Sequence, residues 1–163
     1  MKPYLLGIDI GTSACKVAVF EKSGTVVAAA NGDYPVYYPK EGWAEQDPEE
    51  WWSAVCQAVK KAIQKAGIAP EEIAGIGIDG QSWSAIPIDK EGNVLANTPI
   101  WMDTRAQSIC DRLNEEIGAE QIFEVSGNSL QPSYTTAKIL WYKENLPEVY
   151  EKIDKILQSN SYI

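Results

Sequence analysis

The stretch Leu5-Leu6-Gly7-Ile8-Asp9-Ile10-Gly11-Thr12-Ser13-Ala14-Cys15-Lys16-Val17-Ala18-Val19-Phe20 decides the fold. Two apolar runs flank a Gly/Thr/Ser turn, and this pattern predicts two antiparallel strands joined by a short loop. A carboxylate, Asp9, precedes the turn and a single cation, Lys16, follows it. With two hydroxyls and a glycine that permits close approach, these groups suit a phosphate–magnesium unit. The alternative is an ordinary hairpin in which residues 11–13 only shape the turn.

Composition and charge limit the classes of protein to consider. The 163 residues, 45% hydrophobic and 23% charged, predict a globular chain that buries about 70% of its unfolded surface. The net charge of −9 argues against nucleic acid and anionic membranes as partners, and no stretch approaches a membrane span. Three separated cysteines favour a cytoplasmic location over a disulfide framework. The absence of histidine excludes Ser-His-Asp and Cys-His catalysis within this segment.

Turn signals divide the rest of the chain into expected elements. A third strand over 26–30 completes a three-strand meander, and a proline-rich extended loop follows over 31–46. An Asp47-Pro48 start and a closing Gly67 predict a helix over 48–66. Further strands are expected over 73–78, 85–88, 94–95 and 155–157, and further helices over 106–117, 121–125 and 135–144. This order indicates an α/β fold with a mixed sheet.

Residues 75–80 spell GxGxxG, the dinucleotide-binding pattern, which belongs between a strand and a helix. Here the first two glycines lie inside an apolar run, and no helical periodicity follows them. We therefore interpret these glycines as positions where backbone packs closely on the opening hairpin. An oxidoreductase built on this motif would change NADH fluorescence on titration, which we do not expect.

Three aspartates, Asp9, Asp79 and Asp103, each end an apolar run just before a turn or helix. Ligands collect at the carboxyl ends of strands in α/β sheets, so the three carboxylates are expected to surround one cleft. The alternative is that Asp79 and Asp103 are turn and N-cap residues, which aspartate commonly supplies.

Polar and aromatic residues after two of the apolar runs predict a sugar site. Gln81, Ser82 and Trp83 follow one strand end directly, and 101–105 would add a second wall. Indole faces pack on the C–H surfaces of sugars, while amides and hydroxyls bond to sugar hydroxyls. The other tryptophans considered are interpreted as core or helix-surface packing: Trp51, Trp52 and Trp141.

Four ordered motifs resemble the FGGY family of carbohydrate kinases. They are DIGTSACK over 9–16, GWAEQDP over 42–48 leading into two tryptophans, GIDGQ over 77–81 and WMDTR over 101–105. The similarity continues through 138–141 and 154–157, and it looks strongest to the xylulose kinases. The family's fold is actin-like and ribonuclease-H-like, with helices on both faces of the sheet. The resemblance therefore implies that residues 1–163 are the truncated N-terminal domain of a much longer kinase.

The resemblance also implies roles for individual residues. The residues expected to contact ATP are Asp9, Gly11, Thr12, Ser13 and Lys16, and Asp9 is also expected to hold Mg²⁺. The residues expected to contact the sugar are Gln81, Ser82, Trp83, Trp101, Asp103 and Arg105. A general-base aspartate is expected beyond residue 163, so no catalytic residue is assigned within this chain.

The implied activity is phosphorylation of a sugar hydroxyl by ATP in the full-length protein, with the isolated chain inactive. Xylulose kinases have Gln-Met-His where this chain has Gln-Ser-Trp at 81–83. Because an indole donates one hydrogen bond and accepts none, the substrate stays open among ketoses, polyols and aldonates. The alternative is a non-catalytic sugar- or nucleotide-binding module on the same scaffold. Apolar surface left open by an absent domain favours self-association, for example as a homodimer.

Overall fold

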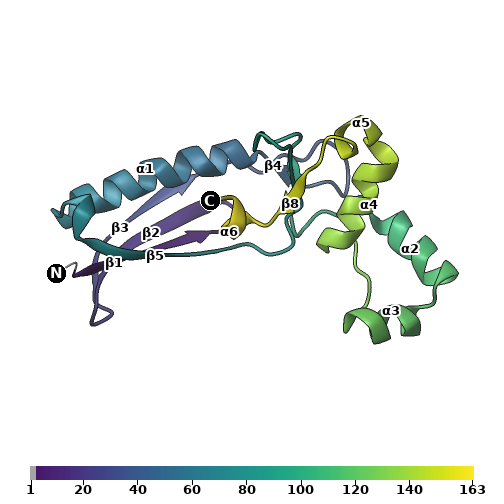
Figure 1. Cartoon of the computed structure of the whole chain (residues 1–163), viewed down its shortest axis with the longest axis horizontal. Coiled ribbons are helices and arrows are strands. Elements are labelled where there is room, and N and C mark those ends of the chain that lie inside the picture. The colour runs from purple at the N-terminus through teal and green to yellow at the C-terminus, as the bar shows by residue number, and fades with distance from the viewer. Residues whose placement is uncertain (1–2) are drawn as a thin grey trace. The chain divides into compact units, whose positions relative to one another are not determined.

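The computed structural model describes residues 3–163, which form two compact units (Figure 1). Of the described residues, unit 1 comprises 3–36, Asp47–Gln81 and Ser159–Ile163, and unit 2 comprises Tyr37–Gln46 and Ser82–Gln158. The chain expected from its length to form one domain thus divides into two units, each built from separate stretches of sequence.

Unit 1 is built on a four-stranded sheet with the strand order β3-β2-β1-β5. The strands are β1 (Tyr4–Ile10), β2 (Ala14–Glu21), β3 (Val26–Asp33) and β5 (Ile73–Gly80). The first three pair antiparallel as a meander, and β5 joins β1 in parallel. The predicted α/β fold, with a mixed sheet opened by an antiparallel meander, is confirmed.

One face of this sheet is apolar and is covered by α1 (Pro48–Ala66), which runs along the strands in Figure 1. Alternate residues of β1 and β2 are buried on it: Leu6, Ile8, Ile10, Cys15, Val17 and Val19. The Asp47 carboxylate caps the helix by accepting a hydrogen bond from Glu49 N at 2.9 Å. Gly67 ends it in the left-handed conformation, with φ of 66°. The helix expected over 48–66 is confirmed.

The opposite face is open within unit 1. Its first row pairs Asp79, Asp9, Lys16 and Asn31 across the four strands, and its second row pairs Gly77, Gly7, Ala18 and Ala29. These side chains are charged, polar or small, and they line a depression of about 680 Å³. Helices were expected on both faces, but among the described residues of this unit no helix packs on this one. The charged residues of the first row, Asp79, Asp9 and Lys16, oppose burial of this face under an apolar helix.

The GxGxxG residues form part of β5, and the chain continues from Gly80 without a helix. A dinucleotide-binding turn is therefore excluded. A Cβ on Gly80 would lie 2.5 Å from Ser159 Oγ, so this glycine is required by close packing. A Cβ on Gly77 would meet nothing within 4 Å, so the same interpretation does not hold there. The short helices η1 (Pro70–Glu72) and α6 (Ser159–Tyr162) complete the unit.

Unit 2 combines two small antiparallel strand pairs with four helices in the described chain. The strands β4 (Glu45–Gln46) and β7 (Thr98–Pro99) form one pair, and β6 (Ile86–Ile88) and β8 (Lys155–Leu157) form the other. The helices are α2 (Gln107–Glu116), α3 (Ala119–Ser126), α4 (Thr135–Asn145) and α5 (Pro147–Tyr150). The core residues are Ala85, Ala106, Ile109, Cys110, Ala137, Trp141 and Tyr142. Among the described helices of both units, none has the length and apolarity that crossing a membrane requires.

Candidate functional site

The turn between β1 and β2 in unit 1 is held by backbone and tyrosine contacts. Gly11 N donates to Ala14 O at 3.1 Å, which closes the turn. Tyr34 lies just beyond β3, where its hydroxyl donates to Gly11 O at 2.7 Å and its backbone N donates to Ser13 O at 3.2 Å. Tyr34 is buried, and this burial raises the pKa of its phenol above the usual range, so the hydroxyl stays a donor. The turn therefore has a fixed backbone shape.

Asp9 and Lys16 face the same side of the sheet, next to this turn. They are paired residues of β1 and β2, and Lys16 Nζ lies 3.4 Å from Asp9 Oδ2. Their side chains are 51% and 68% exposed, so the ion pair is weak and both groups remain open to a ligand. Asp79, the partner of Asp9 on β5, lies on the same open face. The structure thus brings two of the three strand-end aspartates together in unit 1.

The donor chemistry of this corner fits a phosphate-bound magnesium ion. Within residues 3–163, no three His, Cys, Asp or Glu side chains gather as a protein-only metal site requires. Mg²⁺ usually takes only one or two carboxylates from the protein and completes its shell with water and phosphate oxygens. Asp9 offers one exposed carboxylate of this kind, and Lys16 offers a cation beside it.

In unit 2, the tryptophans of the predicted sugar site are exposed. Trp83 is 43% exposed and Trp101 is 44% exposed, while Ser82 beside Trp83 is also on the surface. The Trp83 ring packs against Tyr134, with ring centroids 4.9 Å apart. Tyr134 was not foreseen as part of this surface, because it lies fifty residues further along the chain. Gln81 belongs to unit 1, where its backbone N donates to Ile10 O at 2.8 Å.

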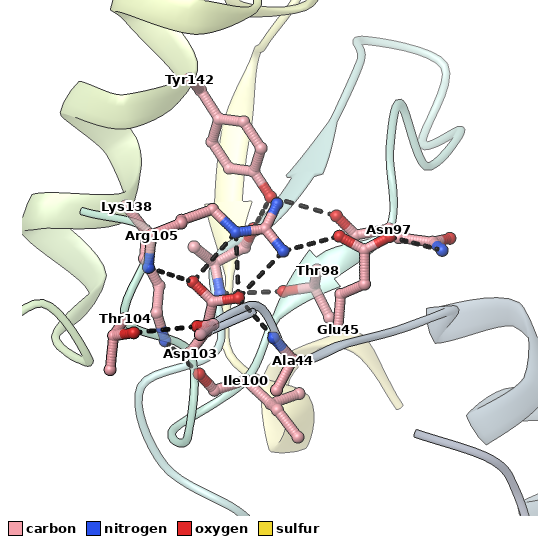
Figure 2. A network of polar contacts seen from close by, with 12 residues as sticks. Ala44, Glu45, Asn97, Thr98, Ile100, Asp103, Thr104, Arg105, Lys138 and Tyr142 are labelled. Atoms are coloured by element: carbon pink, nitrogen blue, oxygen red, sulfur yellow. Dashed lines mark hydrogen bonds and ion pairs between the residues drawn. The ribbon is translucent and has the colours of Figure 1, made fainter. Parts of the chain in front are cut away.

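Asp103 and Arg105 occupy the interior of unit 2 (Figure 2). The Asp103 side chain is 0% exposed, and the Arg105 side chain is 3% exposed. Arg105 Nε donates to both Asp103 oxygens, at 2.9 and 3.0 Å, and its Nη2 donates to Glu45 Oε2 at 2.6 Å. Asp103 Oδ2 also accepts a hydrogen bond from Ala44 N at 2.7 Å. The carboxylate and the guanidinium thus satisfy each other instead of facing solvent.

The Arg105 guanidinium is also enclosed by two indoles. Its central carbon lies 4.0 Å from the Trp43 ring centroid and 4.9 Å from that of Trp141. A cation in this position gains from both π faces, and with 3% of its side chain exposed it presents little surface to a sugar hydroxyl. Asp103 and Arg105 thus have a structural role, in which they join segment 43–45 to segment 103–105, while their contact with the sugar stays a prediction.

Sequence reasoning missed two polar residues of α4, Lys138 and Tyr142. Both are fully or almost fully buried, with exposed fractions of 0% and 1%. Burial is the main cause that lowers the pKa of Lys138 to about 7, against a raising effect of Asp103. The sequence did contain a sign that Lys138 is buried. This lysine lies on the same helical face as Ala137 and Trp141, where a solvated lysine is not expected.

The comparison with known families decides the assignment. The sequence pattern of the N-terminal domain of the FGGY family of carbohydrate kinases matches residues 4–163. The chain belongs to the FGGY family of carbohydrate kinases. This confirms the family that the four sequence motifs indicated, and it agrees with the actin-like arrangement of the sheet and α1.

Individual FGGY kinases match the chain over nearly its whole length. Glycerol kinase 2 of Thermotoga maritima is 39% identical over 153 residues, covering 93% of this chain and 31% of that protein. Xylulose kinase of Bacillus subtilis is 32% identical over 160 residues, covering 98% of this chain and 32% of that protein. The gluconate kinase structure from Lactobacillus acidophilus superimposes with a TM-score of 0.89 at 31% identity, covering 98% of this chain and 32% of that one.

The chain therefore spans about a third of the length of the relatives it matches. The motifs looked most similar to xylulose kinases, but glycerol kinase 2 of Thermotoga maritima has the higher identity of the two relatives named here, 39% against 32%. The FGGY assignment accordingly identifies a carbohydrate kinase domain without naming the carbohydrate.

Proposed function

We propose that this chain is the N-terminal part of an ATP-dependent carbohydrate kinase and supplies its phosphate-binding hairpin and part of its sugar site. The observation that carries the proposal is the exposed Asp9–Lys16 pair beside the rigid turn 11–13, on an open sheet face. Membership of the FGGY family supports the kinase chemistry. The span of about a third of the relatives' length supports a longer parent protein.

In the proposed reaction a sugar hydroxyl attacks the γ-phosphoryl group of ATP in line. Little covalent chemistry falls to the protein, so positioning and charge stabilisation carry the catalysis. Lys16 offers an ammonium to the phosphate oxygens, and residues 11–13 offer a fixed turn that backbone can bring close to them. Asp9 would hold Mg²⁺, which supplies charge neutralisation at the phosphates when bound. The base that removes the hydroxyl proton is expected beyond residue 163.

The sugar side of the proposal rests on Trp83, Trp101 and Ser82, the exposed members of the predicted set in unit 2. Two indole faces suit the C–H surface of a sugar or polyol. Arg105 is already bound to two carboxylates, so it offers no open cation to the carboxylate of an aldonate. This pairing favours a neutral ketose or polyol as substrate. The names glycerol kinase and xylulose kinase belong to the same two classes, whereas the gluconate kinase reported above is named for an aldonate.

The test is a panel of ketoses, polyols and aldonates with the complete gene product that carries this chain, read by ADP release. We expect turnover of a neutral substrate, with Asp9→Asn and Lys16→Met each losing most of it. Lys22→Met is the matched control, because Lys22 is an exposed lysine of the neighbouring β2–β3 turn. Sugar or nucleotide binding without turnover in the complete protein would instead support the non-catalytic binding module.

A further inference from the structure

We propose that Lys138 is a positioning residue that fixes the two exposed tryptophans of unit 2, Trp83 and Trp101, through one buried ammonium group. The inference deepens the proposed function and rests on it, because it concerns the sugar surface of that site. The four family motifs do not include this lysine, although the similarity noted over 138–141 begins with it.

One face of α4 donates hydrogen bonds to three successive carbonyls of segment 83–85. Thr135 Oγ1 donates to Ser84 O at 3.3 Å, Lys138 Nζ to Trp83 O at 2.8 Å and Tyr142 Oη to Ala85 O at 3.0 Å. Positions 135, 138 and 142 share one face of a helix because they are spaced by three and four residues. These carbonyls therefore accept their hydrogen bonds from side chains of helix α4, where a strand would accept them from the backbone of a neighbouring strand.

The same helix face also holds the second segment, 97–100. Lys138 Nζ donates to Ile100 O at 2.8 Å, and Tyr142 Oη donates to Asn97 O at 3.3 Å (Figure 2). The carbonyl of Ile100 belongs to the peptide group that begins Trp101. The ammonium of Lys138 therefore contacts a peptide group directly adjacent to each exposed tryptophan.

Trp83 needs such a restraint because of its backbone. Its φ is 65°, and among residues 3–163 it alone combines a side chain with a positive φ. A bulky residue stays in this conformation only when the surroundings hold it there. Its carbonyl is held by Lys138, and its ring packs on Tyr134, which precedes α4. Helix α4 therefore holds both the backbone and the ring of Trp83.

The chemistry of an ammonium suits this position. It has three donors on a long flexible stem, and here two of them reach carbonyls from different segments. The charged groups that act on it are Asp103, which favours the ammonium, and Arg105, which opposes it. Methionine has a similar length and no donor, so Lys138→Met removes both hydrogen bonds while filling most of the same space.

The experiment uses the complete gene product with Lys138→Met, and Lys143→Met as the matched control on the exposed side of α4. We expect Lys138→Met to raise the sugar KM about tenfold or more, since small misplacements of binding groups are costly. The nucleotide KM should stay within a factor of about two, because the lysine holds only the sugar-side segments. Equal changes in both KM values, or none in the sugar KM, would overturn the proposal.

A second measurement does not depend on the kinase reaction. Fluorine NMR of protein labelled with 5-fluorotryptophan, assigned with Trp83→Phe and Trp101→Phe, should show these two resonances shifted or broadened in Lys138→Met and the others unchanged. Unchanged Trp83 and Trp101 signals refute the positioning role, even if no sugar is phosphorylated. Shifted signals in a protein without turnover keep the positioning role and reject the proposed function. If Lys138→Met does not fold, Lys138→Arg must shift the same two signals, because its guanidinium is larger.

Discussion

Replacing Arg105 by methionine should destabilise the protein strongly, because Arg105 neutralises a carboxylate that water cannot reach. Asp103 is 0% exposed and, of its described hydrogen bonds, would keep those from Ala44 N and Arg105 N, with the Lys138 ammonium as the remaining nearby cation. Breaking a buried ion pair on one side costs about 3–5 kcal/mol. Glu45, at 17% exposed, can regain water and adds little. We therefore expect Arg105→Met to lower the free energy of unfolding by about 4 kcal/mol.

The assay is urea unfolding of the wild type, Arg105→Met, Asp103→Asn and the double variant. Asparagine keeps the shape of Asp103 without its charge, so the double variant should recover about 2 kcal/mol of the loss in Arg105→Met. The sugar KM of any variant that remains folded should change little. A loss below about 1 kcal/mol, additive effects in the double variant, or a large rise in sugar KM at unchanged stability would refute the structural role and restore a sugar contact.

Three further outcomes test other contacts. Burial lowers the pKa of Lys138 to about 7, and the unfolded lysine binds more protons between pH 7 and its ordinary pKa. The free energy of unfolding of the wild type, minus that of Lys138→Met, should therefore rise with pH in this window by at most about 1.4 kcal/mol per pH unit. A decrease of this difference with pH would contradict the burial of Lys138. Tyr34→Phe removes the 2.7 Å bond to Gly11 O, so it should cost about 1 kcal/mol in urea unfolding and raise the ATP KM more than the sugar KM. Gly80→Ala places a Cβ 2.5 Å from Ser159 Oγ and should lower the free energy of unfolding, measured by thermal unfolding, by about 1–3 kcal/mol. Adding Ser159→Ala should recover part of this loss. No loss in Gly80→Ala would contradict the crowding at this site.

The parts of the fold that local signals determine could be predicted from the sequence. Helix α1 begins after Asp47 and ends before Gly67 because both caps act on groups within one turn. The β1–β2 hairpin follows from two apolar runs on either side of a Gly/Thr/Ser turn. Strand β3 runs to Asp33, beyond the expected end at 30. Gly32 made the end of this strand hard to predict, because glycine is uncommon in strands. The glycine is needed where α1 approaches, since a Cβ added at Gly32 would lie 2.7 Å from Ala54 O.

The parts that depend on distant partners could not be predicted. Asp103 and Arg105 were predicted as sugar ligands because their partners, Ala44 for Asp103 and Glu45 for Arg105, lie about sixty residues earlier in the chain. Strand β7 was not predicted, because Pro99 argued against a strand. It forms by pairing with Glu45–Gln46. The hydrophobic spacing of 135–144 predicted α4 but gave no reason for Lys138 to turn inward. The side chains that face a ligand and those that hold them were thus indistinguishable before the fold was known.

Unit 2 can be regarded as two insertions into the chain of unit 1, one over 37–46 and one over 82–158. The second insertion leaves and re-enters its host at neighbouring points, since Ser159 Oγ donates to Gln81 O at 2.8 Å. Close exit and entry points are what make an inserted module exchangeable between proteins. If unit 2 carries the proposed sugar site, its exchange between related enzymes should change the preferred sugar and leave the proposed phosphate-binding hairpin unchanged. Such a graft must carry 37–46 as well, because Glu45 belongs to the ion pairs of Arg105.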